Sequence, residues 1–166
     1  DVNQYASVLT NSVERMQIVL RDLLEYSRAA NAGAGDGTAD LSAALQAAQE
    51  ILENEISESG AVIKASSLPV TRGETMQMCH VFQNLLSNAL KYRKKGVQPE
   101  IKISARRQVN EWIISVEDNG IGFEPEYERQ IFGLFKRLHN REYPGTGLGL
   151  AICQRIVERF GGRIWA

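Results

Sequence analysis

The sequence contains few of the residues that mark several classes of protein. Only two of its 166 residues are cysteines, Cys79 and Cys153, and they form no CxxC pair. A reducing, cytoplasmic compartment is the simplest interpretation. Only two residues are histidines, His80 and His139, so any histidine chemistry within the chain must use one of them. No apolar run approaches the roughly 18 residues that a membrane span requires, and no charged-then-apolar leader opens the chain.

The charge balance excludes further classes. Lys and Arg number 19 and Asp and Glu number 20, for a net charge of -1. This argues against nucleic-acid binding, because such proteins usually carry a basic excess. Hydrophobic residues make up 43% and charged residues 23% of the chain, as in an average globular protein rather than a disordered or fibrous one. We therefore expect one soluble domain with some additional structure, or the soluble part of a longer protein.

Residues 2–28 have apolar side chains at helical spacing and contain neither Pro nor Gly, which predicts one long amphipathic helix. Its apolar positions are Val2, Leu9, Val13, Met16, Leu20, Leu23 and Leu24. A lone helix cannot bury such a stripe, so a bundle or a coiled-coil dimer is implied. Small, flexible residues follow at 29–37 and predict a domain boundary.

The remainder of the chain mixes helical and strand patterns. Helices are predicted from an Asp40 cap to Gly60 and over residues 74–92, 125–132 and 149–160. Strands are predicted over residues 61–65, 68–70 and 163–166, with an antiparallel hairpin at 101–105 and 112–116 that turns near 109–110. This order favours an α+β fold with helices on one face of a sheet.

The helix at 74–92 carries a polar stripe. His80, Asn84, Asn88 and Lys91 recur at four, four and three residues, so they share one face of the helix. Any one of them alone is most simply a solvated surface residue. Two asparagines one turn apart are less expected, because Asn is a mediocre helix former. Their amide oxygens suit Mg²⁺, and Lys91 would add a positive charge.

The second hairpin strand ends in an acidic residue. Trp112, Ile114, Val116 and Asp118 share one face of the strand. If that face covers the core, Asp118 points inward and needs hydrogen-bond donors from a ligand or from backbone amides. Residues 119–122 read Asn-Gly-Ile-Gly, which by itself is most simply a turn.

A glycine-rich segment, GTGLGL at residues 145–150, leads directly into the last predicted helix. Backbone amides at the positive end of a helix dipole form a natural phosphate site. The segment is not the dinucleotide GxGxxG motif, and the chain has neither a Walker GxxxxGK[ST] loop nor the HRD and DFG signatures of protein kinases.

Together these segments closely resemble the ATP-binding catalytic domain of sensor histidine kinases, which has the Bergerat or GHKL nucleotide fold. The four matching segments are residues 84–92 (N box), 118–122 (first glycine box), 132–137 (F box) and 145–150 (second glycine box). The amino-acid sequence of residues 135–139 and 141–146 is most similar to that of the phytochrome-type and multi-sensor subgroup. Residues 16–28 resemble the second helix of the family's dimerization bundle.

The resemblance implies a two-layer sandwich of helices on a mixed, mostly antiparallel sheet, preceded by one long bundle helix. Residues 1–30 would be the second helix of a dimerization and histidine-phosphotransfer bundle whose first helix is absent. Residues 31–39 would be a flexible linker, and residues 40–166 would be the ATP-binding catalytic domain without its last strand.

The resemblance also implies roles for individual residues. Asp118 would accept a hydrogen bond from the adenine amino group, and Tyr92 would flank the adenine. Asn88 would ligate Mg²⁺ with Asn84 beside it, and residues 133–147 would form a mobile ATP lid with phosphate-side cations. The full cofactor-binding set is Asn84, Asn88, Lys91, Tyr92, Asp118, Gly120, Gly122, Lys136, Arg137, Gly145, Thr146, Gly147, Leu148 and Gly149.

The implied function is to bind Mg²⁺-ATP and to donate its γ-phosphoryl group to a histidine in two-component signal transduction. In the family that histidine lies on the first bundle helix, so no catalytic residue is assigned here. We expect His80 and His139 to be scaffold residues. The implied partners are a second copy, through the N-terminal helix, and a response regulator receiver domain.

Three alternatives remain. Related gyrase, mismatch-repair and chaperone ATPases hold a water-activating Glu where this chain has Asn84, whose amide cannot take a proton from water. A serine kinase of the anti-sigma type lacks the upstream bundle helix. A nucleotide-binding scaffold without kinase activity is disfavoured because the expected nucleotide contacts within the chain are all present.

Overall fold

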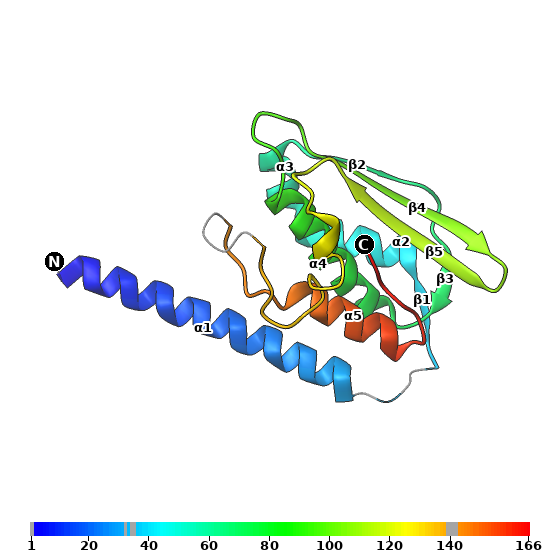
Figure 1. Cartoon of the computed structure of the whole chain (residues 1–166), viewed down its shortest axis with the longest axis horizontal. Coiled ribbons are helices and arrows are strands. Elements are labelled where there is room, and N and C mark those ends of the chain that lie inside the picture. The colour runs from blue at the N-terminus through cyan, green and yellow to red at the C-terminus, as the bar shows by residue number, and fades with distance from the viewer. Residues whose placement is uncertain (1, 32, 34–35, 139–142) are drawn as a thin grey trace.

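The computed structural model describes residues 2–31, 33, 36–138 and 143–166. Helix α1 (Val2–Asn31) extends away from the body of the molecule, and its C-terminal half lies beside α5 (Gly149–Arg159) (Figure 1). The long N-terminal helix predicted over residues 2–28 is therefore confirmed and extends by three residues. None of the helices in the described part of the chain has the length and apolarity needed to cross a membrane.

The helical layer is formed mainly by α2 (Leu41–Ile51) and α4 (Thr75–Lys91), which pack against each other. Asp40 caps α2 as predicted, since its carboxylate accepts a hydrogen bond of 3.0 Å from the Ala43 amide. The helix predicted from Asp40 to Gly60 is divided at Leu52, whose backbone has φ -99° and ψ 15°, into α2 and α3 (Glu53–Ser59). Gly60 ends α3 in the left-handed conformation, at φ 65°.

The sheet layer consists of three strands. β2 (Val62–Ala65) runs parallel to β4 (Glu100–Gln108), and β4 pairs antiparallel with β5 (Glu111–Asp118). A separate antiparallel pair is formed by β1 (Thr38–Asp40) and β3 (Val70–Arg72). Helices covering one face of a mixed sheet confirm the predicted α+β sandwich.

Two hydrophobic clusters hold these layers together. The larger lies between α2, α4 and the inner face of the sheet, where Leu86, Ile101 and Ile103 are almost fully buried. The second joins α1, α4 and α5 through Ala29, Val81, Leu148, Ile152, Cys153, Ile156 and Phe160. Because Ala29 belongs to it, the end of α1 is packed into the body of the molecule.

Residues 38 and 39 depart from the prediction of a linker that extends to residue 39. Thr38 and Ala39 pair with Arg72 and Thr71 of β3, and Ala39 is fully buried. Backbone pairing and burial outweigh the local flexibility of this small-residue segment. The division of the chain into a bundle helix, a linker and a catalytic domain stays a prediction.

Three other elements differ from the expectation. The strand predicted at 68–70 is shifted to β3, since Pro69 has no N–H and its carbonyl accepts a bond from Leu41. The helix predicted at 125–132 is only a 3₁₀ turn, η1 (Pro125–Tyr127), followed by further turns. Residues 163–166 form no strand, since they pair with no strand in the described part of the chain.

Candidate functional site

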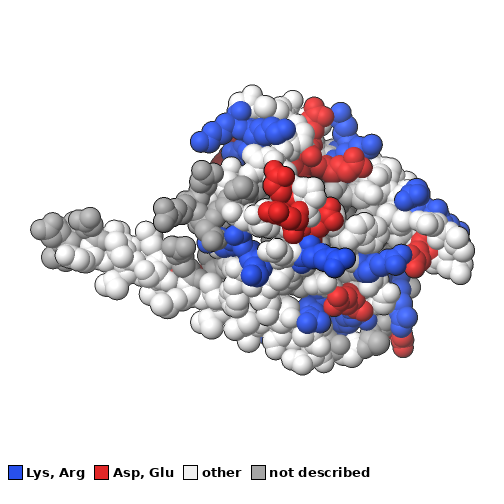
Figure 2. All heavy atoms as spheres, in the orientation of Figure 1, with Lys and Arg blue, Asp and Glu red and all other residues white. Residues whose placement is uncertain are grey.

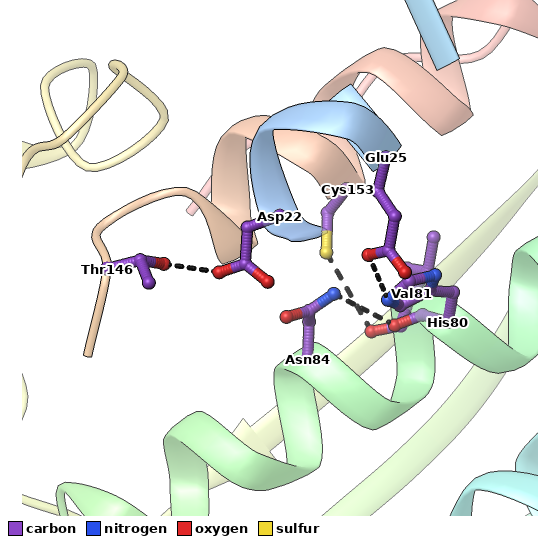
Figure 3. A network of polar contacts seen from close by, with 7 residues as sticks. All are labelled: Asp22, Glu25, His80, Val81, Asn84, Thr146 and Cys153. Atoms are coloured by element: carbon purple, nitrogen blue, oxygen red, sulfur yellow. Dashed lines mark hydrogen bonds and ion pairs between the residues drawn. The ribbon is translucent and has the colours of Figure 1, made fainter. Parts of the chain in front are cut away.

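The polar stripe of α4 is partly buried, and Asn84 is its best-defined member. The Asn84 side-chain nitrogen donates a hydrogen bond of 3.1 Å to the carbonyl of His80 (Figure 3). Its oxygen lies against α5, where a Cβ added at Gly149 would be only 2.7 Å away. The glycine therefore allows the first turn of α5 to approach the Asn84 amide. Asn88, one turn further along, is also half-buried.

Lys91 and Tyr92, at the end of α4, face the glycine-rich segment. The Lys91 ammonium lies 4.4 Å from the centroid of the Tyr92 ring, and a Cβ at Gly145 would be 3.0 Å from it. The rings of Tyr92 and Tyr143 have centroids 5.0 Å apart and are tilted by 59°. Sequence reasoning missed Tyr143, for which the only signal was its position just before the glycines.

Asp118 is the last residue of β5 and is exposed, although the sequence pattern placed it inward if its strand face covers the core. Ile114 and Val116 on the same strand face do pack against the core, and Asp118 pairs with the buried Ile101 of β4. The predicted face is therefore right, but Asp118 lies at the end of the edge strand β5, where its carboxylate is exposed. The carboxylate accepts a hydrogen bond of 2.8 Å from the amide of Gly120. A Cβ at Gly120 would lie 2.6 Å from that same oxygen.

The loop that follows β5 is fixed to the end of α4 and to β4. The Ile121 amide donates to the Tyr92 carbonyl at 2.9 Å. The Asn119 side chain accepts from the Glu100 amide at 2.9 Å and donates to the Gln98 carbonyl at 3.0 Å. Gly122 has a φ of 66°, and a Cβ there would meet nothing within 4 Å. Asn119 is thus a structural clamp. Gly122 makes the turn and leaves open space beside its Cα, and its role in nucleotide binding stays a prediction.

The F-box segment packs directly on the glycine-rich segment. A Cβ at Gly147, whose φ is 75°, would lie 2.8 Å from the backbone of Phe135 and 2.9 Å from the Lys136 carbonyl. The Lys136 side chain is exposed, and the Arg137 guanidinium donates to the Tyr143 carbonyl. His139, with residues 140–142, lies outside the described residues.

Thr146 and Leu148 lie immediately before α5, which begins at Gly149. Thr146 Oγ accepts a bond of 3.3 Å from the Leu148 amide and donates one of 2.5 Å to Asp22 of α1 (Figure 3). Leu148 is fully buried and gives α5 no side-chain cap. The first-turn amides of α5 are therefore suited to an anion. Asp22 was not predicted, since nothing local to residues 20–25 indicates a contact with residue 146.

Other titratable groups on α4 and α5 include one histidine in an ion pair and two thiols. His80 pairs with Glu25 of α1 at 3.1 Å. Burial raises the pKa of Cys153 to about 12 and also raises that of Cys79, so neither is a nucleophile. No group of three His, Cys, Asp or Glu side chains among the described residues is arranged to hold a metal. A cation here would depend on amide oxygens together with oxygens of its substrate.

Comparison with known proteins identifies the class of protein that this arrangement represents. Residues 73–166, more than half of the chain, match the family described as "Histidine kinase-, DNA gyrase B-, and HSP90-like ATPase". The chain belongs to this family. It is 40% identical over 166 residues to Cyanobacterial phytochrome A of Nostoc sp., a match that covers 99% of the chain and 22% of the phytochrome. It is 31% identical to Sensor protein kinase WalK of Staphylococcus aureus, over 98% of the chain and 41% of that protein.

Solved structures give the same result. The structure of full-length ShkA, solved in complex with AMPPNP, is similar with a TM-score of 0.76 and a sequence identity of 25%. The match covers 98% of this chain and 35% of the ShkA chain. The structure of the histidine kinase ThkA, solved in complex with the response regulator protein TrrA, is similar with a TM-score of 0.70. The match covers 99% of this chain and 47% of the matched chain. Its identity is 21%, so it shows the fold alone. The predicted resemblance to a sensor histidine kinase catalytic domain is confirmed. The chain spans about a fifth of the phytochrome relative.

Proposed function

We propose that the chain binds Mg²⁺-ATP between α4, the β5 loop and the start of α5, and donates the γ-phosphoryl group to a histidine outside it. The observation that carries this proposal is the close approach of glycines to the polar side chains of the other motifs. Gly149 lies against Asn84, Gly145 against Lys91, and Gly120 against Asp118. Glycine at these positions leaves the polar groups accessible to a ligand.

The phosphate side of the proposed site combines Lys91 with the amides at the start of α5. Both favour an anion, and Leu148 offers no side-chain cap that would compete for those amides. Asn88 is half-buried on the same helix face as Asn84 and would supply one amide oxygen to Mg²⁺, which keeps water and phosphate oxygens as its other ligands. When bound, the ion neutralises charge on the transferred phosphoryl group. Lys136 and Arg137 are the further phosphate-side cations of the proposal.

The adenine side rests on Asp118 and Tyr92. A carboxylate is an acceptor only, and the Gly120 amide fixes one of its oxygens at the exposed end of β5. It can accept a further bond from the exocyclic amino group of adenine. Tyr92 is adjacent, because its carbonyl holds the same loop through Ile121. Its ring, which also contacts Lys91 and Tyr143, would flank the base.

Asn84 favours phosphoryl transfer over ATP hydrolysis. An amide cannot take a proton from water, and the Asn84 amide is already oriented by its bond to the His80 carbonyl. Catalysis would then rest on positioning and charge neutralisation, as is usual for phosphoryl transfer.

The proposed partners are a second copy of the chain and a response regulator receiver domain. The apolar stripe of α1 is exposed, with Leu9, Val13, Met16 and Leu20 each more than half accessible. On the face seen in Figure 2, the coloured Lys, Arg, Asp and Glu side chains gather over the body of the molecule, and the projecting helix is mostly white where it is not grey. An exposed amphipathic helix of this kind favours pairing with a second copy. The response regulator follows from the motif resemblance, and a cytoplasmic location is proposed on the same ground.

The proposal is tested with radiolabelled ATP. We expect the chain to bind Mg²⁺-ATP in calorimetry but to acquire no acid-labile phosphate. A longer chain that includes the preceding bundle helix with its histidine should become labelled. Failure to bind nucleotide would contradict the proposed site, and label on His80 or His139 would contradict the external acceptor.

A further inference from the structure

The C-terminal half of α1 contacts the rest of the molecule through one helix face, which we term the docking face: Asp22, Glu25, Tyr26 and Ala29. These residues follow one another at i, i+3, i+4 and i+7 and therefore lie on one side of the helix. At about 100° per residue, the exposed apolar stripe of α1 lies on the opposite side. The same helix can therefore contact the body of this chain and a second copy at once.

Three of these residues attach α1 to α4 and α5. Glu25 pairs with His80 at 3.1 Å (Figure 3). The Tyr26 hydroxyl accepts a bond of 3.0 Å from Arg155, whose guanidinium also lies 5.5 Å from the ring centroid. Ala29 is buried in the second hydrophobic cluster. The two side-chain bonds, from Glu25 and Tyr26, are not made to residues of the proposed nucleotide site, whereas Ala29 shares its cluster with Leu148.

Asp22 is different, because it reaches the glycine-rich segment itself. Its carboxylate accepts the 2.5 Å hydrogen bond from the Thr146 hydroxyl (Figure 3). That hydroxyl also accepts a bond from the Leu148 amide. A bond from a hydroxyl to a carboxylate is among the stronger hydrogen bonds in proteins. It places a negative charge beside the start of α5, where the phosphates of a nucleotide would lie.

We infer that Asp22 is a positioning residue that makes docking of α1 and binding of nucleotide antagonistic. In the docked arrangement its carboxylate holds Thr146 and repels the phosphates. Bound nucleotide therefore favours release of α1, and by linkage docked α1 weakens nucleotide binding by the same factor. The inference rests on the proposed function and adds its regulation by the helix that precedes the site.

The first test compares nucleotide affinities in variants. Asp22→Asn removes the charge and keeps the side-chain shape, so we expect the affinity for Mg²⁺-AMPPNP to rise about fivefold or more, within the usual range of such couplings. Adenosine has no phosphates, and its affinity should not change. The matched control Glu14→Gln removes the same charge from an exposed position two turns earlier on α1 and should leave both affinities unaltered.

A second variant separates the charge from the docking. Ala29→Arg places a bulky side chain in the docking face about two turns from Asp22, so it should release α1 and raise the Mg²⁺-AMPPNP affinity as Asp22→Asn does. The double variant should gain no more than the better single variant, since both act through one equilibrium. Additive gains would contradict the coupling.

The reciprocal effect is measured with spin labels at the exposed residues Ser27 and Lys102, on α1 and β4. Saturating Mg²⁺-AMPPNP should lengthen the distance between the labels in the unsubstituted protein. If nucleotide binds but neither the variants nor this distance respond, the inference is wrong and the proposed function stands. If no nucleotide binds, both are wrong.

Discussion

The side-chain oxygen of Asn84 lies directly against Gly149, at a point where an added Cβ would be 2.7 Å from it. The two residues come from α4 and α5, and their contact joins the N box to the second glycine box. The position of α5 relative to the polar stripe therefore depends on the absence of a side chain at residue 149.

Gly149→Ala tests this dependence. Alanine is more favourable than glycine in a helix, so the fold should be retained. The added methyl must displace the Asn84 amide, and we expect the affinity for Mg²⁺-AMPPNP to fall at least about tenfold, equivalent to ~1.4 kcal/mol. Calorimetry measures the change. Gly33→Ala is the control, because a Cβ there meets nothing within 4 Å, and it should bind nucleotide normally.

Asp118→Asn tests the adenine side of the proposed site. The substitution replaces one acceptor oxygen with a donor, which an exocyclic amino group cannot bind. Hydrogen bonds to charged groups contribute about 1.5–3 kcal/mol, so the affinity for ATP should fall roughly 10- to 100-fold or be lost. Glu117→Gln changes the neighbouring exposed carboxylate of β5. Equal ATP affinities of the two variants would show that Asp118 does not bind the adenine.

Elements that rest on local periodicity could be predicted from the sequence. The helices at 2–28, 74–92 and 149–160 and the 101–116 hairpin all form within a few residues of the expected bounds. Strand β1 could not be predicted, since Thr38 and Ala39 are ordered only by pairing with β3. The exposure of Asp118 depends on its place at the end of the edge strand β5, which strand alternation does not reveal.

The candidate site, like the fold, could be predicted only in part from the sequence. The four motifs were recognisable because each is a contiguous run of residues. Asp22 and Tyr143 were missed because their contacts, with Thr146 and Tyr92, join segments that are distant in the chain. A polar residue on a helix face carries no local sign of the partner that the tertiary fold brings to it.

Asn119→Ala separates a structural role from a binding role within one motif. The Asn119 side chain bonds to the backbone of both Gln98 and Glu100. Removing two such bonds should lower the free energy of unfolding by about 1–3 kcal/mol, measured by urea denaturation. Nucleotide affinity should fall less than in Asp118→Asn. Gln108→Ala, at the exposed far end of β4, should leave the stability unchanged, and an equal loss in both variants would contradict the clamp.

The two thiols should be unreactive in the folded protein. Burial raises the pKa of Cys153 from 9.0 to about 12 and raises that of Cys79, so little thiolate forms at pH 8. Iodoacetamide should modify both only after unfolding, as counted by mass spectrometry. Because the folded pKa of Cys153 is the higher one, its contribution to stability is complete below pH 9 and is lost as the pH rises toward 12. Cys153→Ala should lose this part of the alkaline destabilisation, and a variant as pH-sensitive as the unsubstituted protein would show that Cys153 does not titrate in this way.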